Sequence, residues 1–401
     1  MQPVNCPNCT HGSMTSFYQV GPVPVHSVAL VRTYQDAIGF PMGRIELAMC
    51  GRCGFIGNIA FDQSKMHYSP DCEETQGFSP TFTAFHRRLA SDLIARFDLR
   101  NKTILEIGCG KGEFISLLCA MGSNRGIGFD PAFEPRRTPA EGGEAVTFYQ
   151  EFYSERSVHA GADFIACKMT LEHIPDTFAF VNTVRRAIGE SRPMVFFQVP
   201  DMQRVLTDVA FWDIYHEHCS YFTDESLRNL FTLCGFQVLE SWRDYDDQYL
   251  MITATPAPEL SAAQIRPPSH ADLERVRTFA DEASQRTEFW KRTLEDASRN
   301  ERKVVLWGSG SKAVSFLSSV GDIGTATARY VVDINPFRHN CFMPGTGQQI
   351  VGPQFLAGYK PDLVIAMNSI YIPEIESDLH NLSLQPAVMP IEAREMIPAP
   401  G

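Results

Sequence analysis

The 401-residue chain has no run of about 18 apolar residues, so no segment is expected to span a membrane. Positive charge is also scarce: 35 Lys and Arg residues stand against 47 Asp and Glu residues, for a formal net charge of −12. Proteins that bind nucleic acid usually present basic patches that release counterions from the phosphate backbone. The sequence therefore argues against nucleic-acid and membrane partners and favours a small-molecule substrate.

Features of a secreted protein are missing as well. Asn5 and Cys6 stand where a secretion signal would have a basic and then an apolar stretch. The 11 cysteines are too sparse for a disulfide scaffold, and an odd count leaves a free thiol. We expect a cytoplasmic, globular protein of two or three domains.

A strand that runs into a glycine-rich turn is the most informative feature present. Residues 104–113 read Ile-Leu-Glu-Ile-Gly-Cys-Gly-Lys-Gly-Glu. The alternate glycines let the backbone turn tightly and approach a ligand where a side chain would collide. With an acidic residue two positions before the first glycine, the pattern is typical of S-adenosylmethionine (SAM) sites. Such turns also bind NAD or nucleotide phosphates, or occur as plain tight turns.

A second acidic residue follows about one strand-helix-strand unit later. Asp130 ends the apolar run 126–130, where a carboxylate can bind both ribose hydroxyls of a nucleoside. We therefore predict a SAM site and methyl transfer. The residues assigned to the cofactor are Glu106, Gly108, Gly110, Gly112, Asp130, Phe152 and Lys168.

Four cysteines form two pairs, Cys6-Pro-Asn-Cys9 and Cys50-Gly-Arg-Cys53. Two such pairs can supply four thiolate ligands to a tetrahedral zinc ion. Because four cysteines close the coordination shell and leave no position for water, we expect a structural zinc rather than a catalytic one. The alternative is that the four are unrelated buried cysteines.

The alternation of predicted strands and helices indicates an α/β fold with a parallel, doubly wound sheet. Strands are expected at 104–107, 126–129, 163–167 and 194–199, with helices at 82–97, 114–119 and 178–188. The predicted domains are a small zinc-binding domain over 1–70, a class I Rossmann-like SAM-binding methyltransferase domain over 71–255, and a linker, helix and second Rossmann-like domain over 256–401.

The second Rossmann-like unit begins at residue 303, after a Pro-rich linker at 255–269 and a long polar helix over 271–300. Its turn contains Gly308 and Gly310 and is followed by Lys312, and Asp333 ends the next apolar run. Backbone amides at a helix N-terminus with a nearby Lys suit a phosphate group, so Gly308, Gly310 and Lys312 are candidate substrate ligands. Alternatively, the unit serves only as a docking wall.

Titratable side chains are concentrated beyond the fourth and fifth predicted strands, where such sheets bind their ligands. Segment 168–176 contains His173, and segment 212–222 contains Tyr215, His216, Glu217 and His218. His and Tyr beside a sulfonium can abstract a proton and hold an enolate oxygen, as carbon methylation alpha to a ketone requires. A surface loop, or a second metal site with His216 and His218 as ligands, is the alternative.

In order and spacing, these motifs resemble the three-part sugar C-methyltransferases of deoxysugar pathways across nearly the whole chain. The resemblance rests on the paired CxxC motifs, the glycine turn, Glu-His-Ile-Pro-Asp, Tyr-His-Glu-His-x-Ser-Tyr-Phe, and the C-terminal Gly-x-Gly-x-Lys, Asp-x-Asn-Pro and Pro344-Gly-Thr346. It implies a zinc-binding part, a SAM-binding part and a C-terminal domain that helps enclose a nucleotide-linked 4-keto sugar, methylated at C3. It further implies that His218 removes the C3 proton with help from Glu217, and that Tyr215 and His173 surround the enolate and keto oxygens.

One segment departs from that family. Where the family usually has His-Gly-Gly-Ser-Leu-Arg, this chain has Asp246-Asp-Gln-Tyr-Leu-Met251. A diphosphate would find less positive charge there, so either the substrate differs or residues 308–312 hold the phosphates. Two other functions stay open: an O- or N-methyltransferase of another small metabolite, and a non-catalytic zinc- and nucleotide-binding adaptor.

Overall fold

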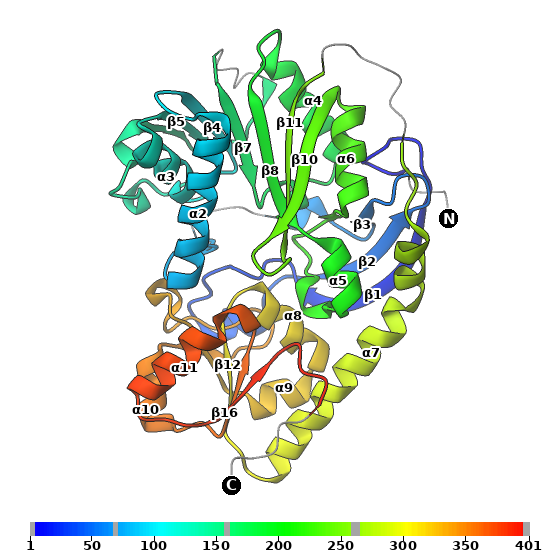
Figure 1. Ribbon diagram of the computed structural model, residues 1–401. Coiled ribbons are helices and arrows are strands. Elements are labelled where there is room, and N and C mark those ends of the chain that lie inside the picture. The colour runs from blue at the N-terminus through cyan, green and yellow to red at the C-terminus, as the bar shows by residue number, and fades with distance from the viewer. Residues whose placement is uncertain (1–4, 67–70, 156–160, 258–264, 396–401) are drawn as a thin grey trace.

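Three β-sheets organise the chain, which the computed structural model describes over residues 5–66, 71–155, 161–257 and 265–395 (Figure 1). The N-terminal sheet is antiparallel, in the order β1-β2-β3-β9. Its strands are β1 (Met14–Pro24), β2 (Met42–Cys50), β3 (Ile56–Asn58) and β9 (Ser220–Tyr221). Because β9 comes from far along the chain, this sheet is completed by the segment that carries the Tyr-His-Glu-His motif.

The middle sheet has seven strands in the order β10-β11-β8-β7-β4-β5-β6. All neighbours are parallel except β11, which is antiparallel to β8 and β10. The strands are β4 (Thr103–Ile107), β5 (Arg125–Phe129), β6 (Val146–Tyr149), β7 (Phe164–Lys168), β8 (Met194–Pro200), β10 (Phe236–Asp244) and β11 (Tyr249–Pro256). Strand order reverses between β4 and β7, and doubly wound sheets bind ligands at that switch point.

The C-terminal sheet has five parallel strands in the order β14-β13-β12-β15-β16. They are β12 (Val304–Trp307), β13 (Tyr330–Val332), β14 (Gln349–Val351), β15 (Leu363–Ala366) and β16 (Ala387–Pro390). Its switch point lies between β12 and β15. The chain therefore contains two doubly wound units, and the predicted α/β fold class is confirmed.

Helices cover these sheets and join them (Figure 1). They are α1 (Tyr34–Ile38), α2 (Pro80–Phe97), α3 (Glu113–Gly122), α4 (Thr177–Ile188), α5 (Met202–Asp208), α6 (Asp224–Leu233), α7 (His270–Arg299), α8 (Ser311–Val320), α9 (Asp322–Thr327), α10 (Leu356–Tyr359) and α11 (Ile372–Asn381). Side-chain caps explain several starts: Ser79 caps α2, Asp176 caps α4, and Thr223 and Ser226 form a capping box on α6. The Asp of Glu-His-Ile-Pro-Asp is thus a helix cap.

Helix α7 connects the three parts. It is 30 residues long and runs along one side of the molecule (yellow-green in Figure 1), packing against β1, α5, α8 and α9. Trp290 of α7 and Trp212 of the middle part are fully buried in one apolar cluster that also contains Ile45 of β2 and Phe316 of α8. Because this core is shared, the three parts hold one another in place. The predicted domain boundaries stay a prediction.

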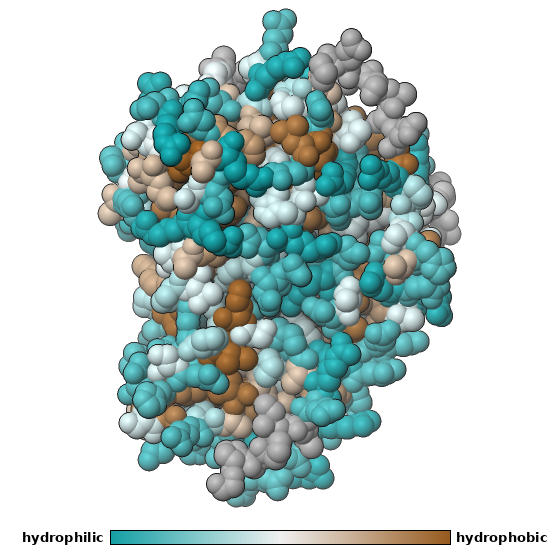
Figure 2. Space-filling view, viewed as in Figure 1, coloured by the Kyte–Doolittle hydropathy of each residue, from teal (hydrophilic) through white to brown (hydrophobic). Residues whose placement is uncertain are grey.

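The visible face of the molecule is mostly hydrophilic, with smaller hydrophobic areas (Figure 2). Among the helices that the structure describes, none is long and apolar enough to cross a membrane.

Candidate functional site

The glycine turn after β4 adopts a backbone that only glycine accepts easily. Gly108, Gly110 and Gly112 have φ angles of +70°, +55° and +80°. A Cβ on Gly108 would lie 2.0 Å from Oγ1 of Thr170, and one on Gly112 would lie 2.5 Å from the Phe148 ring. The turn therefore lies directly against the residues that follow β7, at the switch point of the middle sheet.

Asp130 holds this turn in place. Its carboxylate accepts hydrogen bonds from the backbone N–H of Gly110, at 2.9 Å, and of Ala132, at 2.7 Å. Each carboxylate oxygen has a further lone pair, so these bonds are compatible with binding ribose hydroxyls as well. Burial raises the pKa of Asp130.

Two more residues assigned to the cofactor, Glu106 and Lys168, are buried and interact electrostatically. Burial raises the pKa of Glu106 to about 8 and lowers that of Lys168, and each group partly offsets the shift of the other. The Lys168 ammonium also lies 3.3 Å from Nε2 of His86 and over the Phe114 ring. Phe152, in contrast, is 68% exposed. The structure thus brings the charged candidates into one neighbourhood with the turn and leaves Phe152 at the surface.

The loop with the Tyr-His-Glu-His motif is held from three sides. Strand β9 pairs with β3 of the N-terminal sheet. The hydroxyl of Ser315, on α8, donates to the carbonyls of Phe211 and Ile214 at 3.1 and 2.8 Å. The N–H of Cys219 donates to the carbonyl of Glu172, in the short helix that follows β7. Each of the three parts therefore fixes the position of this loop.

Three of the four predicted catalytic side chains come together. The ring centroid of His218 lies 4.3 Å from that of Tyr215 and 4.7 Å from that of His173. His173 follows β7 on the same segment as Thr170, which contacts the glycine turn. The rings therefore lie next to the segment that borders the predicted cofactor site.

Burial sets the protonation of these rings. It lowers the pKa of His173 to about 4 and that of His218 well below its ordinary value, and it raises the pKa of Tyr215. Both imidazoles are therefore neutral near pH 7, and the Tyr215 hydroxyl keeps its proton. Nδ1 of His173 lies 3.1 Å from the carbonyl oxygen of Glu217. Since a carbonyl only accepts, Nδ1 carries the hydrogen and Nε2 of His173 is left as an acceptor.

The side chain of Glu217 accepts hydrogen bonds from Ser27 of the N-terminal part. Oε1 accepts hydrogen bonds from the backbone N–H of Ser27, at 3.0 Å, and from the Ser27 hydroxyl. The hydroxyls of Ser27 and Ser311 are 2.6 Å apart. Glu217 thus links the N-terminal part to the start of α8. Its predicted assistance to His218 stays a prediction.

His216 faces away from this cluster. It is buried, its ring centroid lies 5.3 Å from that of Phe61, and a Cβ on Gly43 would collide with it. Two groups of at least three potential metal ligands occur in the described part of the chain, and neither includes His216. The structure gives no support to a site shared by His216 and His218.

The four paired cysteines meet in the N-terminal part. All four thiols are buried, and their sulfur atoms lie within 4.8 Å of one another. The Sγ atoms of Cys6 and Cys53 are 3.7 Å apart, and those of Cys9 and Cys50 are 3.8 Å apart. A Cβ on Gly12 would lie 2.2 Å from Sγ of Cys50, so this site leaves no room for a side chain there.

The glycine turn of the C-terminal part has a similar arrangement. Asp333 accepts a hydrogen bond from the N–H of Ser309 at 2.9 Å, as Asp130 does from Gly110. The φ angle of Gly308 is +107°, whereas Gly310 has open space where a Cβ would point. The turn thus keeps the form of a ligand-binding turn.

Lys312 already has partners in the middle part. Its Nζ lies 2.8 Å from the Asp213 carboxylate and 3.2 Å from Oε1 of Gln248. The Lys312 ammonium, which the sequence predicts to bind a phosphate, is therefore already paired with the Asp213 carboxylate.

The segment that departs from the family forms the β10–β11 turn. Tyr245, Asp246 and Asp247 have φ angles of +56°, +57° and +54°, a region that favours glycine and that Asp tolerates better than most residues. The Tyr245 hydroxyl donates to that of Tyr371 at 2.6 Å. This turn therefore contacts the C-terminal part.

Comparison with known proteins decides the family. A methyltransferase-domain model matches residues 82–241, and a C-methyltransferase C-terminal-domain model matches residues 265–385. C-methyltransferase NovU from Streptomyces niveus is 24% identical over 394 residues, which cover 94% of this chain and 92% of that protein. The chain is a C-methyltransferase with more than one domain. It is a SAM-dependent enzyme that acts on a small molecule.

Two solved methyltransferase structures match part of this C-methyltransferase. Magnesium protoporphyrin IX methyltransferase from Synechocystis PCC 6803 matches 44% of this chain and 84% of its own, with 13% identity and a TM-score of 0.35. The 1,6-didemethyltoxoflavin-N1-methyltransferase from Burkholderia thailandensis matches 44% of this chain and 81% of its own, with 19% identity and a TM-score of 0.35.

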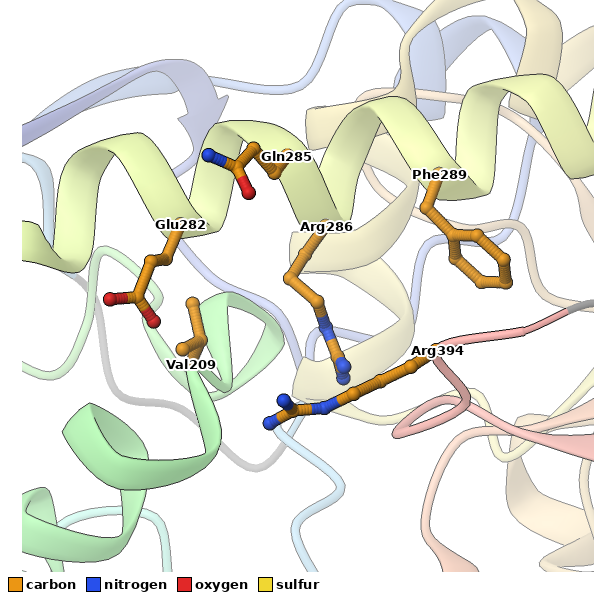
Figure 3. Close-up of a pocket in the computed structure, with 6 residues that line it drawn as sticks. All are labelled: Val209, Glu282, Gln285, Arg286, Phe289 and Arg394. Atoms are coloured by element: carbon orange, nitrogen blue, oxygen red, sulfur yellow. The ribbon is translucent and has the colours of Figure 1, made fainter.

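A cavity of about 250 Å³ lies away from the predicted site residues, none of which lines it (Figure 3). It lies between the end of α5, helix α7 and the segment after β16, and Arg286 and Arg394 extend toward each other across it. The Arg286 guanidinium lies 5.2 Å from the Trp212 ring centroid and donates to the carbonyl of Glu392.

Sequence reasoning missed three residues of the site. Ser27 and Ser311 carry no pattern that distinguishes them from other serines. Glu172 belongs to the Glu-His-Ile-Pro-Asp motif, but the sequence predicts no role for it, because its neighbours are known only from the fold.

Proposed function

We propose that this C-methyltransferase methylates C3 of a nucleotide-linked 4-keto deoxysugar. The observation that carries the proposal is the cluster of the buried His218 with the half-buried His173 and Tyr215 on the segments that border the glycine turn. A carbon alpha to a ketone becomes nucleophilic only when a base removes its proton and a donor holds the enolate oxygen. The cluster offers one group for each task.

His218 is the proposed base. Its ring is neutral, because burial lowers its pKa, and a neutral ring has a free lone pair for a proton. As His218 takes the C3 proton, the electron pair of the C–H bond moves into the carbon–carbon bond of the enolate, and the keto oxygen becomes negative. His218 later releases the proton to solvent.

Tyr215 is the proposed donor to the enolate oxygen, because its raised pKa keeps the hydroxyl protonated. Glu217 keeps the loop in position through Ser27. In its neutral form His173 accepts through Nε2, so it suits a substrate hydroxyl better than an oxyanion. This refines the role that the family resemblance gave to His173.

SAM, when bound, supplies an electrophilic methyl group to the enolate carbon. We infer that it binds at the turn of Gly108, Gly110 and Gly112, with Asp130 at the ribose and with Glu106 and Lys168 as the charged pair beside it. The support is the close-packed turn, in which a side chain at Gly108 or Gly112 would collide with neighbouring atoms. Holding the methyl group in line with C3 supplies much of the rate.

We propose a structural zinc ion at Cys6, Cys9, Cys50 and Cys53. A tetrahedral site with Zn–S bonds of about 2.3 Å has sulfur–sulfur edges of about 3.8 Å. The two measured Sγ–Sγ distances, 3.7 and 3.8 Å, fit that geometry. The ion would stabilise the short sheet against which β9 and the catalytic loop are paired.

The phosphates of the nucleotide are proposed to bind at Gly308, Gly310 and Lys312. The support is the free N-terminus of α8 beside a Lys, since α8 has no side-chain cap. Lys312 would then bridge the substrate and Asp213.

The test is incubation of the purified enzyme with SAM and a nucleotide-linked 4-keto deoxysugar. We expect the product to carry one more methyl group, attached to C3 in its NMR spectrum. A methyl group on oxygen or nitrogen would refute the reaction type. Failure to bind SAM despite intact folding would favour the adaptor.

A further inference from the structure

Glu172 is a buried carboxylate beside the proposed base. It is 1% exposed, and neither of its carboxylate oxygens has a hydrogen-bond partner in the described structure. One of these oxygens, a ring nitrogen of His173 and a ring nitrogen of His218 all lie within 4.8 Å of one another. An unpaired buried carboxylate is costly, so this position needs a reason.

His218 has a matching unpaired atom. Its Nδ1 is buried and has no hydrogen-bond partner in the described residues. His173, the other ring near Glu172, already uses Nδ1 on the carbonyl of Glu217. A carboxylate oxygen of Glu172 lies within 4.8 Å of a ring nitrogen of His218, and catalytic hydrogen bonds are often long before substrate binds.

The carboxylate expected to assist His218 is committed to another contact. Oε1 of Glu217 accepts hydrogen bonds from both the backbone N–H and the hydroxyl of Ser27. Of the acidic side chains of Glu172, Asp213 and Glu217 near the loop, that of Glu172 is the one grouped with the ring nitrogen of His218.

Burial acts on Glu172 and His218 in opposite directions. It raises the pKa of Glu172 to about 8 and lowers that of His218, because in each case the charged form is disfavoured. When His218 gains a proton, an imidazolium next to a carboxylate offsets both penalties at once. The two groups then titrate as a pair, with apparent pKa values that belong to both.

We propose that Glu172 is the positioning residue of the base: its carboxylate accepts the Nδ1–H of His218 and stabilises the imidazolium formed as His218 takes the proton from the substrate carbon. The inference rests on the proposed function. No bond to Glu172 is made or broken except this hydrogen bond, and the proton stays on His218 until it leaves to solvent.

Other titratable groups face this pair. They lie on and after β7, on β9, at the start of β11 and in the loops around them, and they are His26, Cys167, Lys168, His173, Tyr215, Glu217, Cys219, Tyr221 and Tyr249. Glu172→Gln leaves these side chains in place, but it also removes a carboxylate that raises the pKa of Lys168.

The experiment compares wild-type enzyme with Glu172→Gln, measuring how fast solvent deuterium enters C3 of a 4-keto sugar nucleotide at a series of pH values. In the wild type, exchange should rise with pH as the pair loses its proton. In Glu172→Gln only His218 titrates, so the rise should move to lower pH and the plateau should fall on the order of 10²-fold. Glu172→Asp should recover part of the rate and return the rise toward its wild-type position.

Glu217→Gln is the matched carboxylate-to-amide comparison. Its rate should fall because an amide oxygen accepts the hydrogen bonds of Ser27 less strongly than a carboxylate does, while its pH profile keeps the wild-type position. SAM affinity and the near-ultraviolet circular dichroism spectrum show whether each variant is folded. If Glu172→Gln does not fold, Glu172→Asp alone should lower the rate and displace the profile.

Three results would overturn the proposal: a wild-type pH profile in Glu172→Gln, the shift appearing in Glu217→Gln instead, or exchange that requires added Mg²⁺ or Zn²⁺, which would make the group a metal site. Failure of the proposed function looks different. In that case the wild-type enzyme itself would neither exchange deuterium at C3 nor place a methyl group there, whatever residue stands at position 172.

Discussion

At the scale of single residues, the chemistry depends on where protons are held. Burial keeps His173 and His218 neutral and Tyr215 protonated, which gives the site acceptors and a donor near neutral pH. Glu172 and Glu217 lie in the same buried region but have different neighbours. What each of these two carboxylates can bind therefore depends on the residues beside it and not on its residue type.

The cofactor turn gives a prediction at this scale. Asp130→Ala removes the acceptor for two backbone N–H groups and a candidate ribose contact. We expect SAM binding to weaken by about 1–3 kcal/mol, the usual cost of a lost charge-assisted hydrogen bond. Gly110→Val should abolish binding, since Gly110 has a φ of +55° and its Cβ would meet Glu74 at 3.0 Å. Calorimetric titration measures both, and unchanged affinities would refute the SAM assignment.

At the scale of elements, short segments do the positioning. The segment after β7 contacts the glycine turn through Thr170 and His218 through His173. Strand β9 has only two residues, yet it ties the catalytic loop to β3. The N-terminal sheet thereby helps to position the catalytic loop, which lies outside it.

Zinc removal tests this coupling. Elemental analysis should find about one zinc per chain. Cys50→Ser should lose that zinc and loosen β1 to β3, while SAM binding in the middle part stays mostly intact. Turnover should fall because β9 and Ser27 lose their support. A metal-free wild type of full stability would contradict the zinc proposal, and unchanged turnover in Cys50→Ser would contradict the coupling.

At the scale of the whole molecule, the three parts meet around the catalytic loop. Ser27, Glu217 and Ser311 connect one residue from each part. Lys312 of the C-terminal part pairs with Asp213 of the middle part. The site is therefore incomplete in any one part alone.

Lys312→Met tests the phosphate position. Loss of a charge-assisted bond to phosphate should raise KM for the nucleotide-linked sugar about tenfold, with a smaller effect on kcat and none on SAM affinity. Lys303→Met is the control, because Lys303 binds the carbonyl of Tyr359 instead. Equal KM values for both variants and the wild type would place the phosphates elsewhere.

Much of this organisation is predictable from sequence because it is local. The predicted strands begin and end within a residue or two of those observed. For example, the strand predicted at 104–107 is observed as β4, Thr103–Ile107. Contacts between distant segments were not predictable. Ser27 is 190 residues from Glu217, and no pattern shows that they bond or that Lys312 pairs with Asp213. Phe152 is 68% exposed, and its predicted contact with the cofactor stays a prediction.

The most direct test of the central claim is solvent deuterium exchange at C3 of the 4-keto sugar nucleotide by His218→Ala. The variant should bind SAM and substrate like the wild type, yet lose both exchange and turnover by on the order of 10²–10⁴. Near-native exchange and turnover in His218→Ala would contradict the assignment of the base, and His173 would take its place.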